Sequence, residues 1–306
     1  MNFTLRQLEY FKALAEQRNF GRAAALCNVS QPALSVQVRA LEEAAGGRLV
    51  ERLSRDVVLT PLGREVLEQA HRVLEAARGL DHVVRDAGGS GRHLALGLIP
   101  TIAPYLLPGV LAALRAENLS LEVNVREAKT AVLIEELGQG TLDAAVMALP
   151  SGTSGLREVP LFDDRFLLAG SESRLARAKA VHPLDVAPNQ LLLLEDGHCL
   201  TDQALEVCGR ERDAPGLNLG ASSLGTLSQL VAAGFGLTLM PELAALSESR
   251  GAPDLRLRRF PAPEPARRIG LVHRRTTPAA GLIDRLARVL REVGEECIAA
   301  ARGVIG

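Results

Sequence analysis

The stretch FGRAAALCNVSQPALSVQVRALEEAA, residues 20–45, decides the fold of the amino-terminal part of the chain. It begins with a short helix rich in small residues, Phe20 to Cys27, which lets another helix approach closely. After a two-residue turn, Ser30 is a preferred helix N-cap and Pro32 is well placed near the first helical position. The pattern therefore predicts a second helix from Ser30 to about Ala45.

The neighbouring residues extend this pair of helices into a small domain. Apolar residues at helical spacing predict an earlier helix over residues 4–18. Gly46 and Gly47 end the helix that starts at Ser30, and residues 48–60 read as a short hairpin. The sequence thus predicts a winged helix-turn-helix over residues 1–60.

The helix after Ser30 has an apolar side and a polar side. Ala33, Leu34, Val38 and Leu41 are expected to face inward. Short polar side chains near the start of a recognition helix suit base edges and phosphates, and arginines in the helix and wing suit phosphates. The expected DNA-binding residues are Ser30, Gln31, Pro32, Ser35, Gln37, Arg39 and Arg52. The alternative is a three-helix scaffold whose polar face is merely solvated.

A long helix is expected over residues 61–87, with an apolar seam compatible with helix pairing. The alternative is a helix packed on its own domain. Residues 88–91, Gly-Gly-Ser-Gly, read as a hinge. From Arg92 onward strands alternate with helices in a β-α-β-α-β order, which predicts an open, largely parallel sheet. A last helix over residues 278–301 is expected to pack back on the first part of this α/β region.

Hydroxyl side chains follow several of the predicted strands, where ligands bind in open α/β sheets. Thr101 follows the first strand, Thr130 follows the second and is expected to cap the next helix, and Ser222 or Ser223 precedes the helix from Leu224. Each offers a hydroxyl and free backbone N–H groups to a small polar ligand. The alternative is that all are plain N-caps.

The segment EDGHCLTDQALEVC, residues 195–208, holds two of the four cysteines of the chain. Cys199 and Cys208 can be small core residues. A zinc site is a weaker interpretation, because this spacing with His198 supplies at most three ligands. A permanent disulfide conflicts with a reducing compartment.

The spacing of the two cysteines favours a redox switch. Nine positions on one continuous helix span about 13 Å, whereas a disulfide needs Cα atoms roughly 4.4–6.8 Å apart. A helix is expected around residues 202–211. If residues 202–207 are helical in the thiol form, a disulfide must unwind or displace them. Cys199 is the better nucleophile, because His198 adjoins it and a helix from about Leu200 directs its positive end at the sulfur. Cys208 would then be the resolving thiol.

Composition places the chain among ordinary globular proteins. It has 306 residues, 47% hydrophobic and 23% charged, with a net charge of −1. The sequence contains no run of 18 apolar residues, so no membrane span is expected. The stretch from Met1 to Arg6 lacks the apolar core of a signal peptide. We therefore expect a cytoplasmic protein.

Several motifs together resemble the amino-terminal signature of LysR-type transcriptional regulators. They are Phe20 to Ala24, Val29 to Ser35, Leu41-Glu42 and Leu59 to Gly63. Val50 stands where the family usually carries an aromatic residue. The resemblance implies DNA binding, a dimerisation helix over 61–87, and a two-lobed α/β effector domain like periplasmic binding proteins. The lobes would be discontinuous, residues 92–162 with 268–306 and residues 163–267.

The later motifs are similar to those of the hydrogen-peroxide-sensing members of that family. The motifs are Leu193 to Leu200, Asp202 to Ala204, Cys208, Leu98 to Thr101, Pro104 to Pro108, Glu127-Ala128, Thr130 and Ile269 to Val272. The resemblance implies a peroxide site formed by Thr101, Thr130, His198 and Cys199. Asp202 and Arg267 match positions tied to the reactive cysteine, and Gly225 lacks an acidic residue that some members carry.

The leading hypothesis is a transcription factor in which H2O2 oxidises Cys199, Cys208 closes a disulfide, and a rearranged dimer alters promoter binding. A second is a LysR-type regulator that binds a small metabolite in the cleft between the lobes. A third, less favoured because a catalyst needs no recognition helix, is a thiol peroxidase. The expected partners are promoter DNA, H2O2, further copies of the chain as a homodimer or homotetramer, and RNA polymerase; no cofactor or metal is expected.

Overall fold

The computed structural model describes residues 3–52, 57–87, 92–117, 121–178, 182–210, 217–277 and 280–305. The chain divides into two units, Met1–Ser90 and Gly91–Gly306. Within the described residues, no helix has the length and apolar character needed to cross a membrane.

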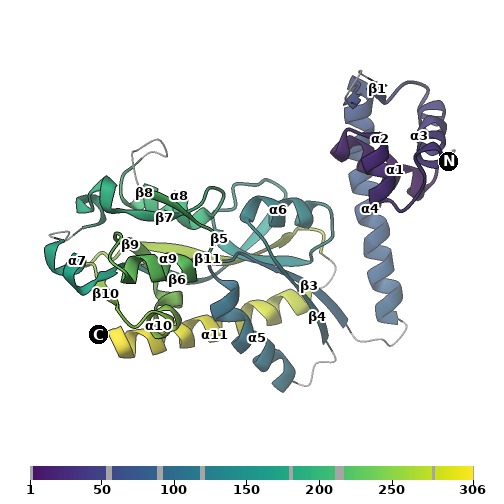
Figure 1. Cartoon of the computed structure of the whole chain (residues 1–306). Helices are drawn as coiled ribbons and strands as arrows, with labels where there is room; N and C mark the ends of the chain where they lie inside the picture. Colours follow the sequence, from purple (N-terminus) through teal and green to yellow (C-terminus); the bar gives the residue numbers. More distant parts are fainter. Residues whose placement is uncertain are drawn as a thin grey trace. The chain divides into compact units, whose positions relative to one another are not determined.

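The first unit has three helices, a hairpin and a long helix (Figure 1). They are α1 (Leu5–Gln17), α2 (Phe20–Leu26), α3 (Gln31–Ala45), β1 (Val50–Arg52), β2 (Val57–Leu59) and α4 (Pro61–Ala87). Local signals set the helix ends: Ser30 accepts a hydrogen bond from the Ala33 N–H, and Gly46 has φ 73°. The predicted helices are confirmed to within about a residue or two. The hairpin tip, residues 53–56, lies outside the described residues.

The core of the first unit confirms most of the inward positions on α3. Leu34, Val38 and Leu41 are buried against the phenylalanine and leucines of α1. Ala33 is exposed, which corrects the sequence prediction. Its position in the first turn of α3 turns it away from α1, although its small side chain suits either environment.

The long helix α4 uses its apolar seam in two ways. Ala70 and Leu74 are buried in the core of the first unit, so part of the seam packs on its own domain. Val73 and Leu80 are 41% and 64% exposed. They stand seven residues apart and therefore share one face of the helix. The predicted hinge, residues 88–91, lies outside the described residues.

The second unit begins with a parallel β-α-β-α-β segment, as predicted. It comprises β3 (Arg92–Leu98), α5 (Ala103–Ala116), β4 (Leu121–Glu127), α6 (Thr130–Gly138) and β5 (Ala144–Leu149). β3 is the middle strand and pairs in parallel with both β4 and β5. The two crossovers run in opposite directions, so right-handed connections put α5 and α6 on opposite faces (Figure 1).

Beyond β5 the sheet is antiparallel, so the prediction of a largely parallel sheet is wrong. The long strand β6 (Leu156–Ser171) pairs antiparallel with β11 (Ala266–Arg274), and then with β9 (Thr238–Pro241) and β10 (Leu255–Arg259). β11 also pairs antiparallel with β5. Asp163, Asp164 and Arg165 interrupt the apolar run of β6, so apolar patterning alone does not reveal the whole strand.

The apolar core of the second unit divides into two clusters. One gathers β3, β5, α5, α6 and the first part of β6, with α11 (Ala280–Ile305) across it. The other surrounds β7 (Leu192–Leu194), α8 (Cys199–Val207), α9 (Leu224–Ala232) and the end of β6. The remaining elements are α7 (Glu172–Arg177), β8 (Leu217–Ala221), α10 (Glu242–Gly251) and two 3-10 turns, Pro183–Asp185 and Pro188–Gln190. β6 contributes residues to both clusters, and β11 pairs with it where one cluster gives way to the other (Figure 1).

Close packing of α11 fixes the first cluster. A Cβ on Gly294 would lie 2.1 Å from the ring of Phe162, and one on Gly109 would lie 2.7 Å from Val293. Glycine is therefore required where α11 crosses β6 and α5. The wrap of the last helix onto the first part of the α/β region is thus confirmed.

Candidate functional site

The exposed face of α3 carries part of the predicted DNA-binding set. Gln31, Pro32 and Arg39 are exposed, whereas Ser35 and Gln37 are half-buried. The Gln37 side chain accepts a hydrogen bond from the Gln7 amide of α1 at 3.1 Å. It is therefore held toward α1, and the exposed residues are better placed to meet a groove.

Two of these residues have structural contacts as well. The Ser30 hydroxyl accepts from the Ala33 N–H at 3.3 Å, so it caps α3. Arg39 pairs with Glu43 at 3.5 Å between largely exposed side chains. The side chain of Arg52 lies outside the described residues.

The wing is fastened to the end of α3 by polar contacts. The Glu42 carboxylate accepts from the backbone N–H groups of Leu49 and Val50, at 2.8 and 3.2 Å. Val50 is buried, so the smaller residue found at the aromatic position still packs in the core. A Cβ on Gly63 would lie 2.0 Å from the Leu49 carbonyl oxygen, which requires glycine there.

In the second unit, Thr101 and Arg267 belong to a buried polar chain that also contains Asp164. Arg267 Nε donates to Asp164 Oδ2 at 3.0 Å, and Nη1 donates to Thr101 Oγ1 at 3.0 Å. All three residues are at most 3% exposed. Arg267 and Asp164 are direct cross-strand partners on β11 and β6. Burial raises the pKa of the Asp164 carboxyl, and the adjacent guanidinium opposes that rise.

The hydrogen bonds among Asp164, Arg267 and Thr101 fix the Thr101 hydroxyl at the carboxyl end of β3. Because its oxygen accepts from Arg267, its own proton can be donated to a ligand. Thr130 follows the adjacent strand β4, which pairs with β3 in parallel, so both threonines come from the same edge of the sheet.

Thr130 does not cap α6, which corrects the sequence prediction. Lys129 occupies the N-cap position and Thr130 is the first residue of the helix. The Thr130 hydroxyl oxygen is buried and makes no hydrogen bond within the described residues. Leaving a buried hydroxyl unpaired costs about 1–3 kcal/mol. Such an oxygen is a candidate ligand contact. By contrast, Ser223 does cap α9, accepting from the Thr226 N–H at 3.2 Å.

Helix α8 carries the two cysteines at its two ends. It spans Cys199–Val207 with Cys208 at the C-cap, rather than the predicted residues 202–211. All four cysteines are free thiols. Nine positions correspond to about 13 Å and about two and a half turns. The two side chains therefore leave opposite sides of the helix: Cys199 packs against the first core cluster, and Cys208 lies in the second.

The surroundings of the two thiols differ. Cys199 is half-buried and, within the described residues, makes no hydrogen bond. Cys208 is 3% exposed, and burial raises the pKa of its thiol while Arg210 opposes the rise. Cys208 thus carries a thiol that is protonated at neutral pH.

His198 is the N-cap residue of α8 and is 5% exposed. Burial lowers the pKa of its imidazole, and the nearby Lys129 lowers it further, against a smaller opposite effect of Glu195. The lowered pKa favours the neutral ring at pH 7, so His198 brings no positive charge to the start of α8. Asp202 lies three residues after Cys199, in the first turn of α8, and is half-buried.

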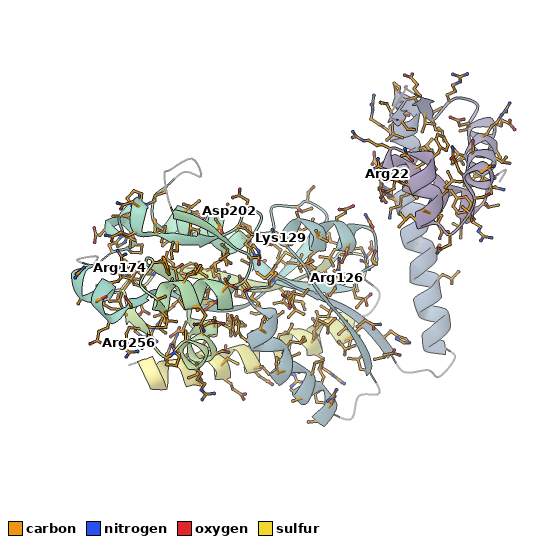
Figure 2. All side chains as sticks on the ribbon, in the orientation of Figure 1. Arg22, Arg126, Lys129, Arg174, Asp202 and Arg256 are labelled. Atoms are coloured by element: carbon orange, nitrogen blue, oxygen red, sulfur yellow. The ribbon has the colours of Figure 1, made fainter. Side chains whose placement is uncertain are left out.

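Lys129 and Glu195 are site neighbours that the sequence interpretation missed. Lys129 Nζ donates to Glu195 Oε1 at 3.0 Å and to the Asp196 carbonyl at 2.8 Å. Glu195 Oε1 also lies 3.8 Å from His198 Nε2. Figure 2 labels Lys129 together with Asp202 on α8. The one available signal was adjacency, since Lys129 precedes Thr130 and Glu195 opens the cysteine segment.

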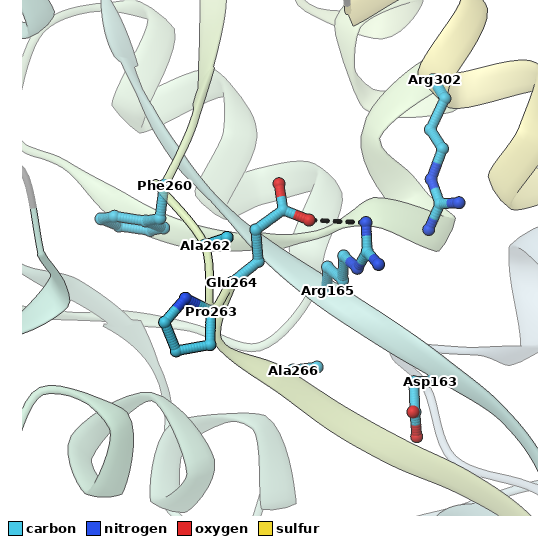
Figure 3. Close-up of a pocket in the computed structure, with 8 residues that line it drawn as sticks. All are labelled: Asp163, Arg165, Phe260, Ala262, Pro263, Glu264, Ala266 and Arg302. Carbon is cyan, nitrogen blue, oxygen red and sulfur yellow. Dashed lines mark ion pairs between the residues drawn. The ribbon is translucent and has the colours of Figure 1, made fainter.

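A pocket of about 550 Å³ lies beside β6 and β11 (Figure 3). It is lined by Asp163, Arg165, Phe260, Ala262, Pro263, Glu264, Ala266 and Arg302. Successive strand residues alternate between faces, so Arg165 and Ala266 face away from the side of Asp164 and Arg267. None of the predicted peroxide-site residues lines this pocket.

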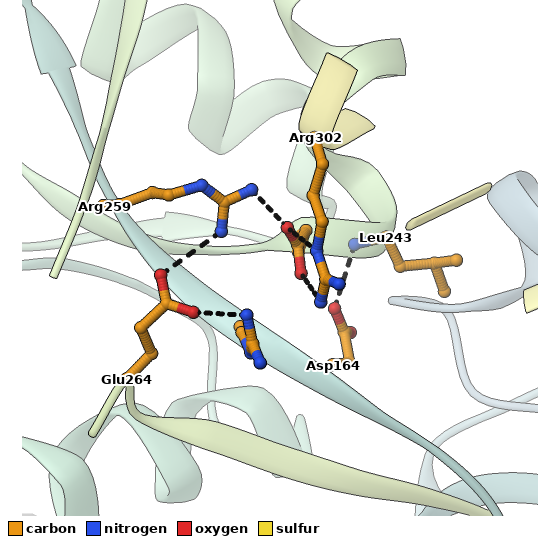
Figure 4. Close-up of polar contacts among 7 residues, drawn as sticks. Asp164, Leu243, Arg259, Glu264 and Arg302 are labelled. Atoms are coloured by element: carbon orange, nitrogen blue, oxygen red, sulfur yellow. Dashed lines mark hydrogen bonds and ion pairs between the residues drawn. The ribbon is translucent and has the colours of Figure 1, made fainter. Parts of the chain in front are cut away.

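The charged side chains around that pocket form ion pairs with one another (Figure 4). Arg165 pairs with Glu264 at 2.6 Å, and Arg302 pairs with the fully buried Glu242 at 3.0 Å. Arg259 contacts both glutamates. The three arginines thus share two carboxylates of the chain itself.

Both units match known protein families. Residues 5–64 match the family model of the bacterial regulatory helix-turn-helix protein, lysR family, and residues 87–295 match the LysR substrate binding domain. The chain is 42% identical over 289 residues to the DNA-binding transcriptional dual regulator OxyR of Escherichia coli, covering 94% of each.

Two solved structures are similar along nearly the whole chain. A full-length cysteine-to-aspartate variant of OxyR from Pseudomonas aeruginosa has a TM-score of 0.70 and 35% identity, covering 95% of each chain. A cysteine-to-serine variant of Corynebacterium glutamicum OxyR, described as H2O2-bound, has a TM-score of 0.63 and 37% identity, covering 98% of this chain and 97% of that one. The chain belongs to the LysR family of bacterial DNA-binding transcriptional regulators, and within that family it is similar to OxyR.

Proposed function

We propose that the protein senses hydrogen peroxide through Cys199 and Cys208 and converts their oxidation into a change in promoter binding. The observation that carries the proposal is α8, whose two ends hold free thiols on opposite sides of one helix. The similarity to the Corynebacterium glutamicum OxyR structure described as H2O2-bound supports the same substrate. A helix that must break before its two thiols can meet gives oxidation a structural consequence.

The chemistry takes two steps. The Cys199 thiolate attacks one oxygen of H2O2, the O–O bond breaks, and the sulfur becomes a sulfenic acid while hydroxide leaves as water after protonation. The Cys208 thiolate then attacks the Cys199 sulfur and displaces its oxygen as a second water. Two thiols are oxidised to a disulfide, and one peroxide is reduced to two waters.

The residues at the edge of the sheet fit a peroxide site. Thr101 has a hydroxyl proton to donate, the Thr130 oxygen is buried and unpaired, and His198 has a neutral ring. Arg267 orients the Thr101 hydroxyl by donating a hydrogen bond to its oxygen. Its guanidinium is also bonded to Asp164, so Arg267 does not need to contact the peroxide itself. We assign Asp202 to the same site from its place one turn after Cys199.

The regulatory output follows from the division of the chain. We propose lobes of residues 92–162 with 268–306 and of residues 163–267, so that α8 lies in the second lobe with its first residue against the first. The exposed Val73 and Leu80 of α4 support self-association of the chain through this helix. A homodimer or homotetramer acting on double-stranded DNA, with RNA polymerase as a further partner in the cytoplasm, completes the proposal.

One experiment tests this function against its rivals. The reduced full-length protein is given one equivalent of H2O2, disulfides are mapped by mass spectrometry, and DNA fragments selected by the protein are footprinted. We expect a Cys199–Cys208 disulfide and a changed footprint in the wild type, and neither in Cys199→Ser. Cys297→Ser is the matched control, because Cys297 lies on α11 rather than α8. Its thiol donates weakly to the Tyr105 carbonyl at 3.8 Å.

The other outcomes separate the alternatives. If Cys199→Ser leaves both the peroxide reaction and the footprint unchanged, the redox function is wrong. A footprint that responds to a small carboxylate and not to peroxide would favour a metabolite regulator, for which the pocket beside β6 offers space. Many rapid turnovers with a thiol reductant would favour a peroxidase.

A further inference from the structure

Lys129 reaches from the start of α6 to the loop that precedes Cys199. It stands at the N-cap of α6, and its own side chain makes no capping bond there. Its ammonium instead donates to the Glu195 carboxylate at 3.0 Å and to the Asp196 carbonyl at 2.8 Å. One side chain thus bridges the helix after β4 and the loop before α8.

The stem of Lys129 adds a packing contact to these two hydrogen bonds. Gly197 has φ +89°, and a Cβ built there would lie 3.1 Å from Lys129 Cδ. The lysine stem therefore lies directly against the Gly197 backbone. Behind the loop, the Glu195 N–H donates to the Ala221 carbonyl at 2.9 Å. The residues that Lys129 touches are those between this anchor and the first turn of α8.

The contact belongs to the thiol form and conflicts with disulfide closure. A disulfide needs Cα atoms roughly 4.4–6.8 Å apart, against the about 13 Å expected along α8. Cys208 is buried in the second cluster, whereas Cys199 is half-buried, so moving the Cys199 side chain uncovers less apolar surface than moving that of Cys208. Since neighbouring Cα atoms are about 3.8 Å apart, a move of this size at Cys199 also displaces Gly197 and Asp196.

We propose that Lys129 is a positioning residue that holds the Glu195–Gly197 loop, and with it the start of α8, in the thiol arrangement. Breaking its contacts is part of the conformational step between sulfenic acid and disulfide. Lys129 therefore sets how readily the disulfide closes and how stable it is, without taking part in the attack on peroxide. This inference rests on the proposed redox function of Cys199 and Cys208.

The test compares Lys129→Ala, Lys129→Gln and Lys129→Arg in the full-length protein. Sulfenic acid formation is measured in a Cys208→Ser background, and disulfide closure is measured with both cysteines present. We expect closure to be about threefold to tenfold faster in Lys129→Ala and Lys129→Gln, given one half-exposed ion pair with two hydrogen bonds. Lys129→Arg should restore slow closure. Because arginine keeps the positive charge near His198, its rate of sulfenic acid formation should match that of the wild type within about twofold.

The control is Arg126→Ala, which removes a neighbouring cation of β4. Arg126 pairs with Glu136 of α6 at 3.2 Å and carries an exposed side chain labelled in Figure 2. Its loss should leave disulfide closure unchanged. Unchanged closure in Lys129→Ala, or an equal slowing of sulfenic acid formation and closure, would overturn the positioning role.

A second measurement does not depend on peroxide. The proteins are equilibrated in glutathione redox buffers, and the oxidised fraction of the Cys199–Cys208 pair is determined by mass spectrometry. Lys129→Ala should favour the disulfide by the same factor by which it speeds closure. If peroxide fails to react but this shift is seen, peroxide sensing is wrong and the role of Lys129 stands. If no Cys199–Cys208 disulfide forms in either experiment, both proposals are wrong.

Discussion

The two ends of α8 lie in different surroundings, because the Cys199 end combines apolar packing with nearby polar groups. The Cys199 end meets polar groups brought from distant parts of the chain, with Lys129 on the loop before it and His198 beside it. The Cys208 end lies among leucines and alanines of the second core cluster. Polar surroundings suit a thiol that reacts with peroxide. Apolar surroundings suit a thiol that stays protonated and reacts only after the helix opens. The difference suggests that reactivity is controlled at one end and timing at the other.

The largest effect is expected from Asp164→Asn, which tests the polar scaffold on the Cys199 side. Arg267 is 3% exposed and would lose its charge partner. An unpaired buried charge costs about 3–5 kcal/mol, so the free energy of unfolding should fall by that amount in urea titrations. Peroxide oxidation of Cys199 should also slow, because Thr101 loses its fixed donor.

Asp163→Asn is the matched control for that substitution. Asp163 is the adjacent residue of β6, but it faces solvent and pairs with Arg268 between exposed side chains at 3.0 Å. Its replacement should produce no resolvable change in unfolding. Similar losses in the two variants would contradict the buried role assigned to Asp164.

The second prediction concerns the apolar end. Burial raises the pKa of the Cys208 thiol, so little thiolate is present at neutral pH. The thiolate is the attacking form, and the rate of disulfide closure should rise about tenfold per pH unit between roughly pH 7 and 8.5. Rapid quenching with a thiol alkylating reagent, after sulfenic acid has formed, measures this rate. A rate that stays flat across this range would show that closure is limited by the opening of α8 rather than by the charge of Cys208.

The sequence predicted the elements that depend on local contacts. Helices α1 to α3 follow from caps such as Ser30 and from apolar spacing, and they were found within about two residues. The antiparallel half of the sheet was missed because its charged residues are satisfied across the sheet. Asp164 and Arg267 are 103 residues apart, and no local sequence pattern around either residue predicts that they pair.

The candidate site shows the same limit. The hydroxyls after β3 and β4 and the two cysteines were visible in the sequence, because strand ends and helix spacing are local features. The capping role of Thr130 was wrong, since Lys129 takes that position. The contact between Lys129 and Asp196 was not visible, because it joins segments that meet only when the two core clusters form.

The third prediction compares two buried threonine hydroxyls near the Cys199 end. Thr201 donates to the Leu194 carbonyl at 3.0 Å, whereas the Thr130 oxygen has no partner within the described residues. Thr201→Val should lower the free energy of unfolding by about 1–2 kcal/mol, and Thr130→Val should not lower it. Oxidation of Cys199 by peroxide should slow in Thr130→Val. If Thr130→Val instead destabilises the fold and leaves oxidation unchanged, its hydroxyl is structural.

The smallest effect is expected from Arg210, which, within the part of the chain that the structure describes, lowers the pKa of Cys208 against the effect of burial. Arg210→Ala should raise that pKa further and slow disulfide closure at pH 7 by about twofold to fivefold, since a nearby positive charge favours the thiolate. Arg210→Lys keeps the charge and should lose less. The guanidinium also donates to the Val186 carbonyl, so unfolding in urea must be measured beside the rate. Equal slowing in the alanine and lysine variants would assign Arg210 to the packing of the Cys208 end, and the contrast between a polar and an apolar end of α8 would then hold without any charge at the second.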